Sequence, residues 1–124
     1  MYEVGTAAGV RAFHVMPGME GPEGELHSHD YRIEVLVERV ELDEQGMVCD
    51  LDVLEAALAA IVDHVRDVDL EIIRPAGAAA VTVEVFARWA HGALADAVRK
   101  GGGEAMRVRV FESPVAFAGY RAQL

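Results

Sequence analysis

The chain has 124 residues and a formal net charge of −10 at neutral pH, and 52% of its residues are hydrophobic. This length fits one domain, residues 1–124, that can bury its own core, and the hydrophobic content argues against disorder. The negative charge disfavours a nucleic-acid partner, because phosphate backbones are bound by basic surfaces. It leaves small-molecule ligands open, anionic ones included.

Three absences indicate the cellular location. Cys49 is the only cysteine, so no internal disulfide can form, and no apolar run reaches the ~18 residues of a membrane span. The first residues, Met1-Tyr2-Glu3-Val4, lack the basic and then apolar pattern of a secretory signal. We therefore expect a cytoplasmic protein without a membrane partner.

Strands are expected at both ends of the chain. Residues 2–15 are the first strand, and the prolines and glycines of residues 16–26 predict a loop. Alternating apolar and polar residues predict a long second strand at 27–42. Residues 105–112 and 115–122 are expected to be the last two strands, separated by a turn at Pro114.

Two helices are expected between these pairs of strands. Apolar residues recur at helical spacing over 51–66, directly after Asp50, a suitable N-cap. Pro75 and Gly77 predict a loop over 67–80, and Thr82 is a suitable N-cap for a second helix. The order ββααββ predicts an α+β fold in which two helices cover one face of an antiparallel sheet.

Three histidines are candidate metal ligands. His27 and His29 form a His-x-His pair at the start of the second strand, so both side chains point to the same face. A neighbouring first strand could bring His14 beside them. Three imidazoles with an open fourth position form the ligand set of a catalytic zinc, although imidazole also suits other transition metals. The sequence therefore predicts a zinc site at these three residues.

The order of these motifs resembles the 6-pyruvoyltetrahydropterin synthase and 6-carboxytetrahydropterin synthase family over residues 10–120. The shared features are a histidine on the first strand, Leu26-His27-Ser28-His29-Asp30-Tyr31, Gly46-Met47-Val48-Cys49-Asp50 before a helix, Thr82-Val83-Glu84 at a helix start, and Glu112-Ser113 before the last strand. The resemblance implies the tunnelling fold, in which ββααββ subunits close into a trimeric barrel. Two stacked trimers would give a homohexamer.

The same resemblance implies roles for individual residues. His14, His27 and His29 would bind zinc, and Glu112 would hold the amino-pyrimidinone edge of a pterin, since a carboxylate accepts two parallel N–H donors. Thr82 would lie near the pterin. The implied activity is that of a zinc-dependent lyase of pterin or queuosine metabolism, acting on 7,8-dihydroneopterin triphosphate or a related pterin.

Two parts of the family's catalytic machinery are missing. The family cysteine, four residues before the His-x-His pair, is Glu23 here. The family's Asp-His pair falls on Arg66 and Asp67 in a gapless alignment, while Asp63-His64 lies three residues too early. We therefore expect a divergent member in which Glu23 is the candidate catalytic base. Glu25 is a second candidate, and both could instead be surface charges of the loop.

Several functions remain open at this point. The chain could be an enzyme that eliminates phosphate from the pterin side chain. It could be a variant that cleaves the side chain to 6-hydroxymethyl-dihydropterin, with Glu23 in place of cysteine. It could also be a catalytically silent pterin- or purine-binding protein that keeps the metal site. A different reaction on another heterocycle is a further alternative, since fold does not fix chemistry.

Overall fold

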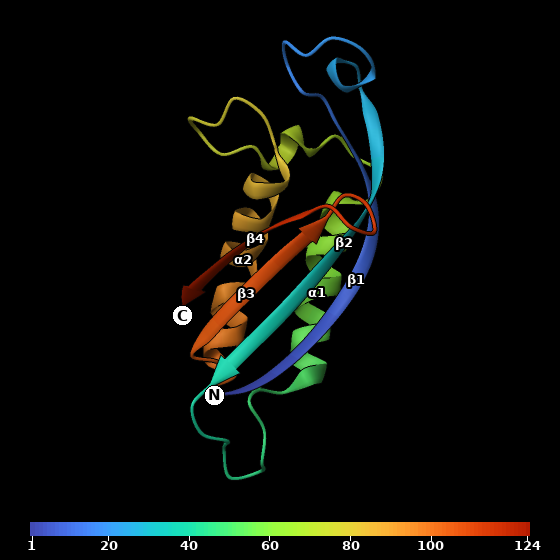
Figure 1. The fold of residues 1–124 in the computed structure, drawn as a ribbon. Helices are drawn as coiled ribbons and strands as arrows, with labels where there is room; N and C mark the ends of the chain where they lie inside the picture. Colours follow the sequence, from blue (N-terminus) through green and yellow to red (C-terminus); the bar gives the residue numbers. More distant parts are fainter.

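The computed structural model describes residues 1–124 and forms one antiparallel four-stranded sheet, in the order β1-β2-β3-β4. The elements are β1 (Tyr2–His14), η1 (Pro22–Gly24), β2 (His27–Arg39), α1 (Leu51–Val65), η2 (Leu70–Ile73), α2 (Val83–Lys100), β3 (Ala105–Phe111) and β4 (Phe117–Gln123). Both long helices lie on the same face of the sheet (Figure 1). The expected α+β fold is confirmed, and neither helix has the length and hydrophobicity needed to cross a bilayer.

Strand alternation decides which face the helices cover. In β2 the odd-numbered residues from Tyr31 to Val37 are buried, and in β3 Met106, Val108 and Val110 are buried. The residues between them in β2 are charged or only partly buried, as expected when one sheet face packs on a core. Leucines of α1 and Phe86 of α2 complete the core.

The structure differs from the expected boundaries by more than one residue at two strand ends. β4 begins at Phe117 because a turn occupies the preceding residues, where Glu112 N–H donates to the Ala116 carbonyl at 3.0 Å and Ala116 N–H donates to the Ser113 hydroxyl at 3.0 Å. β2 ends at Arg39 because its pairing with β3 stops at Glu38. The short helices η1 and η2 were not predicted, since three or four residues carry no readable periodicity.

The segment between α1 and α2 is fastened to the sheet near His14. Asp67 N–H donates to the Arg11 carbonyl at 2.8 Å, and the Val68 carbonyl accepts from Phe13 N–H at 2.9 Å. These two hydrogen bonds cover the outer edge of β1 at its C-terminal end. The remainder of that edge has no partner strand, so β1 stays an edge strand of the sheet.

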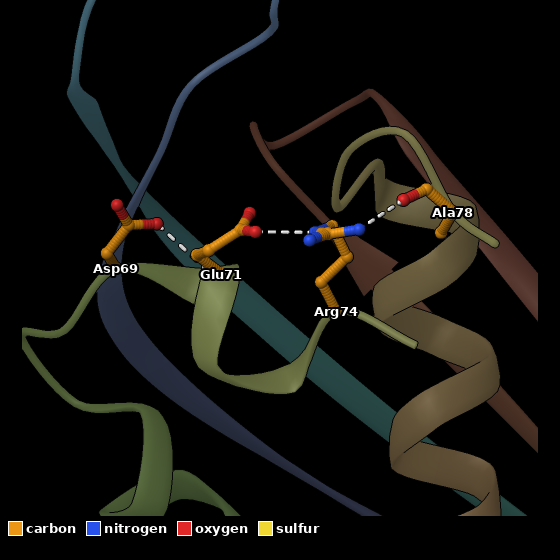
Figure 2. Close-up of polar contacts among 4 residues, drawn as sticks. All are labelled: Asp69, Glu71, Arg74 and Ala78. Atoms are coloured by element: carbon orange, nitrogen blue, oxygen red, sulfur yellow. Dashed lines mark hydrogen bonds and ion pairs between the residues drawn. The ribbon is translucent and has the colours of Figure 1, made fainter. Parts of the chain in front are cut away.

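A row of polar contacts then fixes the approach to α2. Figure 2 shows the Asp69 carboxylate accepting from Glu71 N–H, the Glu71 carboxylate paired with Arg74, and Arg74 donating to the Ala78 carbonyl. The Asp69 and Ala78 contacts measure 2.9 and 2.8 Å. The backbone that follows therefore enters α2 from a defined position.

His91 joins α2 to the last two strands. It is 6% exposed, its Nε2 lies 3.1 Å from the Met106 carbonyl, and its ring packs edge-on against Tyr120 at 4.9 Å. The Arg88 guanidinium lies 4.5 Å above the same tyrosine ring. Burial lowers the pKa of His91 and outweighs the opposing effect of the nearby backbone carbonyls. The folded protein therefore holds this side chain neutral.

We expect the stability that neutral His91 contributes to be complete above about pH 6.5 and to be lost as the pH falls toward its folded-state pKa, because the unfolded chain takes up the proton more readily. Urea unfolding of the wild type and of His91→Gln, measured between about pH 7.5 and 5, tests this. The variant should lose less unfolding free energy on acidification. An identical pH dependence in both proteins would contradict the expectation.

Candidate metal centre

His14, His27 and His29 meet at one end of the sheet. The register of β1 and β2 places His14 opposite His27 and Ala12 opposite His29. The ring centroids lie 4.4 Å (His14–His27), 5.2 Å (His14–His29) and 5.0 Å (His27–His29) apart. One ring nitrogen from each lies within 4.8 Å of the others. The convergence expected from the sequence is therefore present, while metal binding stays a prediction.

Hydrogen bonds to the backbone orient two of the three rings. His14 Nδ1 lies 3.2 Å from the Val81 carbonyl, and His27 Nδ1 lies 2.8 Å from the Glu25 carbonyl. Because a carbonyl can only accept, each Nδ1 carries the hydrogen and each Nε2 keeps a free lone pair. A backbone carbonyl is the usual partner of the second ring nitrogen in metal-binding histidines.

The Nε2 atom of His14 is buried and has no hydrogen-bond partner in the protein. Buried polar atoms are nearly always satisfied, so an unsatisfied one calls for an explanation. Burial lowers the pKa of His14, and the neighbouring His27 and His29 also disfavour its protonation, against opposing contributions from the Val81 carbonyl and Glu112. A neutral imidazole with a free lone pair is a metal ligand, and the three nitrogens, which lie within 4.8 Å of one another, are close enough together to be candidate ligands of one ion.

Three connecting segments lie at the same end of the molecule as these histidines. They are the loop between β1 and β2, the α1–α2 connection, and the hairpin between β3 and β4 (Figure 1). Sequence-distant residues can therefore meet around the histidines. This is the arrangement in which a rigid sheet carries the ligands and the loops carry the remaining chemistry.

Glu112 lies beside this cluster. It follows β3 directly, one position beyond the Arg32–Phe111 pair, which brings it level with Tyr31 of β2. A cleft of about 880 Å³ is lined by both Glu112 and His29, together with Ser28, Asp30, Arg32, Glu34, Phe111, Ser113 and Pro114. The carboxylate predicted to hold a pterin and one of the predicted metal ligands therefore line the same cleft.

Thr82 has a structural task in the chain. Its hydroxyl oxygen accepts from Val85 N–H at 3.2 Å and caps α2, as the sequence predicts. It also follows Val81, whose carbonyl holds His14. Thr82 thus lies one residue from the cluster, and its contact with a ligand stays a prediction.

Glu23 lies in η1, and its side chain is exposed. Its backbone carbonyl accepts from Met16 N–H at 2.9 Å, and no hydrogen bond or ion pair holds its carboxylate. Glu25 is also exposed, and its backbone carbonyl orients His27. Both candidate bases therefore lie in the loop that leads into the histidine pair, and their side chains are exposed.

The residues considered for an Asp-His pair are used elsewhere. Asp63 pairs with Arg66, and Asp67 pairs with Arg11 at 2.7 Å. The His64 ring is exposed and stacks on Trp89, with a centroid distance of 6.0 Å. The structure does not assemble these side chains beside the histidine cluster.

Sequence reasoning missed the groups that orient the cluster. These groups are the backbone carbonyls of Val81 and Glu25. Every residue has a backbone carbonyl, so the sequence does not indicate which ones will bind a histidine. Tyr31 packs edge-on against His29, whereas in the sequence it stands out only as part of the family motif and has no assigned role at the site. Its place two residues after His29, on the same strand face, was the available signal.

The fold is similar to solved structures of 6-pyruvoyltetrahydropterin synthases. A Plasmodium vivax enzyme, in a catalytic-residue mutant with alanine in place of glutamate, gives a TM-score of 0.79 at 14% identity, covering 99% of this chain and 98% of that one. The Caenorhabditis elegans enzyme gives 0.71 at 19% identity, covering 98% and 95%. An uncharacterised protein from Wolinella succinogenes gives 0.70 at 17% identity, covering 96% and 97%. These likenesses establish the fold.

Family membership comes from the sequence itself. Among curated proteins, none is significantly similar to the chain. The profile of the family described as 6-pyruvoyl tetrahydropterin synthase matches residues 4–123, which is nearly the whole chain. The chain therefore belongs to the 6-pyruvoyl tetrahydropterin synthase family and has its tunnelling fold.

Proposed function

We propose that the protein is a zinc-dependent, pterin-converting lyase that acts on 7,8-dihydroneopterin triphosphate or a related pterin. The observation that carries the proposal is the buried, unpartnered Nε2 of His14, which lies beside the imidazoles of His27 and His29. His29 in turn lines a cleft that also contains Glu112. Membership of the family supports a pterin as the substrate class.

Each residue of the centre has a proposed task. Zinc held by His14, His27 and His29 would supply a Lewis acid that polarises an oxygen of the substrate side chain. Glu112 accepts two parallel N–H donors from the pterin ring and fixes its orientation. The cleft of about 880 Å³ has the size of small-molecule sites, which are about 300–1,000 Å³.

Glu23 is the proposed base. The Plasmodium vivax relative has been studied as mutants of a catalytic glutamate, with alanine or cysteine in its place, so a glutamate acts in catalysis in that protein. Glu23 replaces the cysteine expected before the His-x-His pair, and its exposed carboxylate would have to approach the bound substrate. Catalytic hydrogen bonds often form only in the substrate complex. A glutamate base could serve either phosphate elimination or side-chain cleavage to 6-hydroxymethyl-dihydropterin, and analysis of the product distinguishes the two.

A catalytically silent pterin-binding protein is the second candidate. The exposure of Glu23 favours it, as does the use of Asp63 and Asp67 in ion pairs away from the cluster. Such a protein would bind metal and pterin and leave the pterin unchanged. Turnover of the wild type therefore separates the two functions.

We also propose a cytoplasmic homo-oligomer, a hexamer built as a dimer of trimers. The outer edge of β4 and most of the outer edge of β1 have no partner strand in the single chain. Pairing of these edges between subunits would remove two exposed edges that otherwise promote aggregation.

If His14, His27 and His29 form the metal site, each chain should bind one zinc ion. Metal-free wild type should bind zinc in a competition titration, and His14→Ala should lose most of this affinity, because a buried ligand is removed from a set of three. His64→Ala is the matched control, since His64 is exposed and stacked on Trp89. Equal zinc binding by His14→Ala and the wild type would contradict the assignment.

If Glu23 is the catalytic base, replacing it should lower turnover and leave ligand binding intact. With 7,8-dihydroneopterin triphosphate as substrate and chromatographic detection of the product, Glu23→Gln should lower kcat by about 100-fold or more, the usual contribution of general acid–base catalysis. Zinc and pterin binding should persist. Glu20→Gln, in the same exposed loop, is the control. An undiminished kcat in Glu23→Gln, with a loss in Glu25→Gln, would move the role to Glu25.

If Glu112 holds the pterin ring, replacing it should lower the affinity for pterins and leave zinc binding intact. Glu112→Gln removes a charged acceptor, so the dissociation constant of a pterin should rise by about 10- to 100-fold, in line with ~1.5–3 kcal/mol for hydrogen bonds to charged groups. Zinc affinity should stay unchanged. Glu55→Gln, at an exposed position of α1, is the control in the same calorimetric titration. Unchanged pterin affinity in Glu112→Gln would show that Glu112 does not bind the pterin.

A further inference from the structure

The three histidines differ in what orients them. His14 and His27 each bind a backbone carbonyl through Nδ1, whereas His29 makes no hydrogen bond to the protein. The terminal torsion of a histidine side chain has a broad, roughly two-fold energy profile, so the ring can turn unless a contact selects one orientation. His29 therefore needs another constraint if its nitrogen is to face the other two.

We infer that the aromatic ring of Tyr31, held in place by Phe86 of α2, is the positioning group for His29. This inference rests on the proposed metal site and adds to it the residues that set its geometry. Tyr31 would do through ring packing what the carbonyls of Val81 and Glu25 do through hydrogen bonds for the other two ligands.

The contact between Tyr31 and His29 follows from the strand. The two residues lie two apart in β2 on the helix-facing side. Their ring centroids are 5.5 Å apart with planes at 66°, and Tyr31 is also 6.4 Å from His14 with planes at 79°. Both are edge-to-face arrangements, which aromatic rings favour. One tyrosine ring therefore borders two of the three imidazoles.

Phe86 keeps the tyrosine ring from turning away. Tyr31 is 3% exposed and Phe86 is fully buried, and their centroids lie 5.2 Å apart with planes at 70°. Phe86 lies in the first turn of α2, five residues after Val81. The start of α2 therefore constrains two ligands, His14 through a carbonyl and His29 through a pair of rings.

The ring of Tyr31 is the part that matters for this role. Its hydroxyl makes no hydrogen bond to another protein group. Removal of the hydroxyl should therefore be tolerated, and removal of the ring should not.

The test measures metal binding in four variants with cobalt(II) as the probe, since its absorption bands report ligand geometry. Tyr31→Leu should weaken cobalt and zinc affinity by about 10- to 100-fold, as loss of an orienting partner does, and change the cobalt bands. Tyr31→Phe should match the wild type. Phe86→Leu should weaken binding in the same direction. Ile33→Ala, fully buried on the same face of β2, should lower the unfolding temperature and leave metal affinity unchanged.

The outcomes separate this inference from the proposed metal site. If the wild type binds no metal, the metal site and the inference both fail. If the wild type binds metal and Tyr31→Leu, verified as folded by circular dichroism, binds it equally with the same cobalt bands, the inference alone fails. Should Tyr31→Leu not fold, Phe86→Leu decides by the same comparison, and unchanged affinity and bands would overturn the inference.

Discussion

The buried, unpartnered nitrogen of His14 is the constraint around which this end of the molecule is organised. The β1–β2 register sets His14 opposite His27, and the period of two in β2 adds His29 on the same face. The Nε2 atom of His14 finds no hydrogen-bond partner in the protein, although two further imidazoles lie beside it. A metal ion held by His14, His27 and His29 would supply the missing partner, and His29 also lines the cleft that contains Glu112.

The helical layer takes part in this site as well as covering the core. The connection before α2 is fixed by Asp67, Val68 and the row of contacts from Asp69 to Ala78 (Figure 2). That connection places the Val81 carbonyl within hydrogen-bond distance of His14, and the first turn of α2 places the Phe86 ring against Tyr31. The packing of α2 and the geometry of the histidine cluster are thus linked. Substitutions that shift the start of α2 should therefore change the orientation of the histidine rings.

Much of this could be predicted from the sequence, for definite physical reasons. Alternation in β2, helical spacing after Asp50 and the Thr82 cap are local patterns, and each element was found within a few residues of its predicted ends. The period of two in a strand places the two candidate ligands of the His-x-His pair on one face. His14 joins this pair only because β1 and β2 align so that His14 lies opposite His27. The sequence suggests that the two strands are neighbours, but their register is known only from the structure.

The rest depends on contacts that no local pattern records. The carbonyls of Val81 and Glu25 are backbone atoms, and the edge contact of Tyr31 requires a ring from α2. The position of Glu23 was predicted from its spacing before the histidines, but its exposed carboxylate is not placed against them by the free chain. Its role therefore depends on the bound substrate, which the sequence does not describe.

The most direct measurement of the central claim is anomalous X-ray diffraction at the zinc absorption edge from crystals of natively purified protein. The account predicts one strong anomalous peak per chain, about 2.0–2.1 Å from a ring nitrogen of each of His14, His27 and His29. Absence of a peak there after growth with zinc, or imidazole rings that point away from one another, would contradict it.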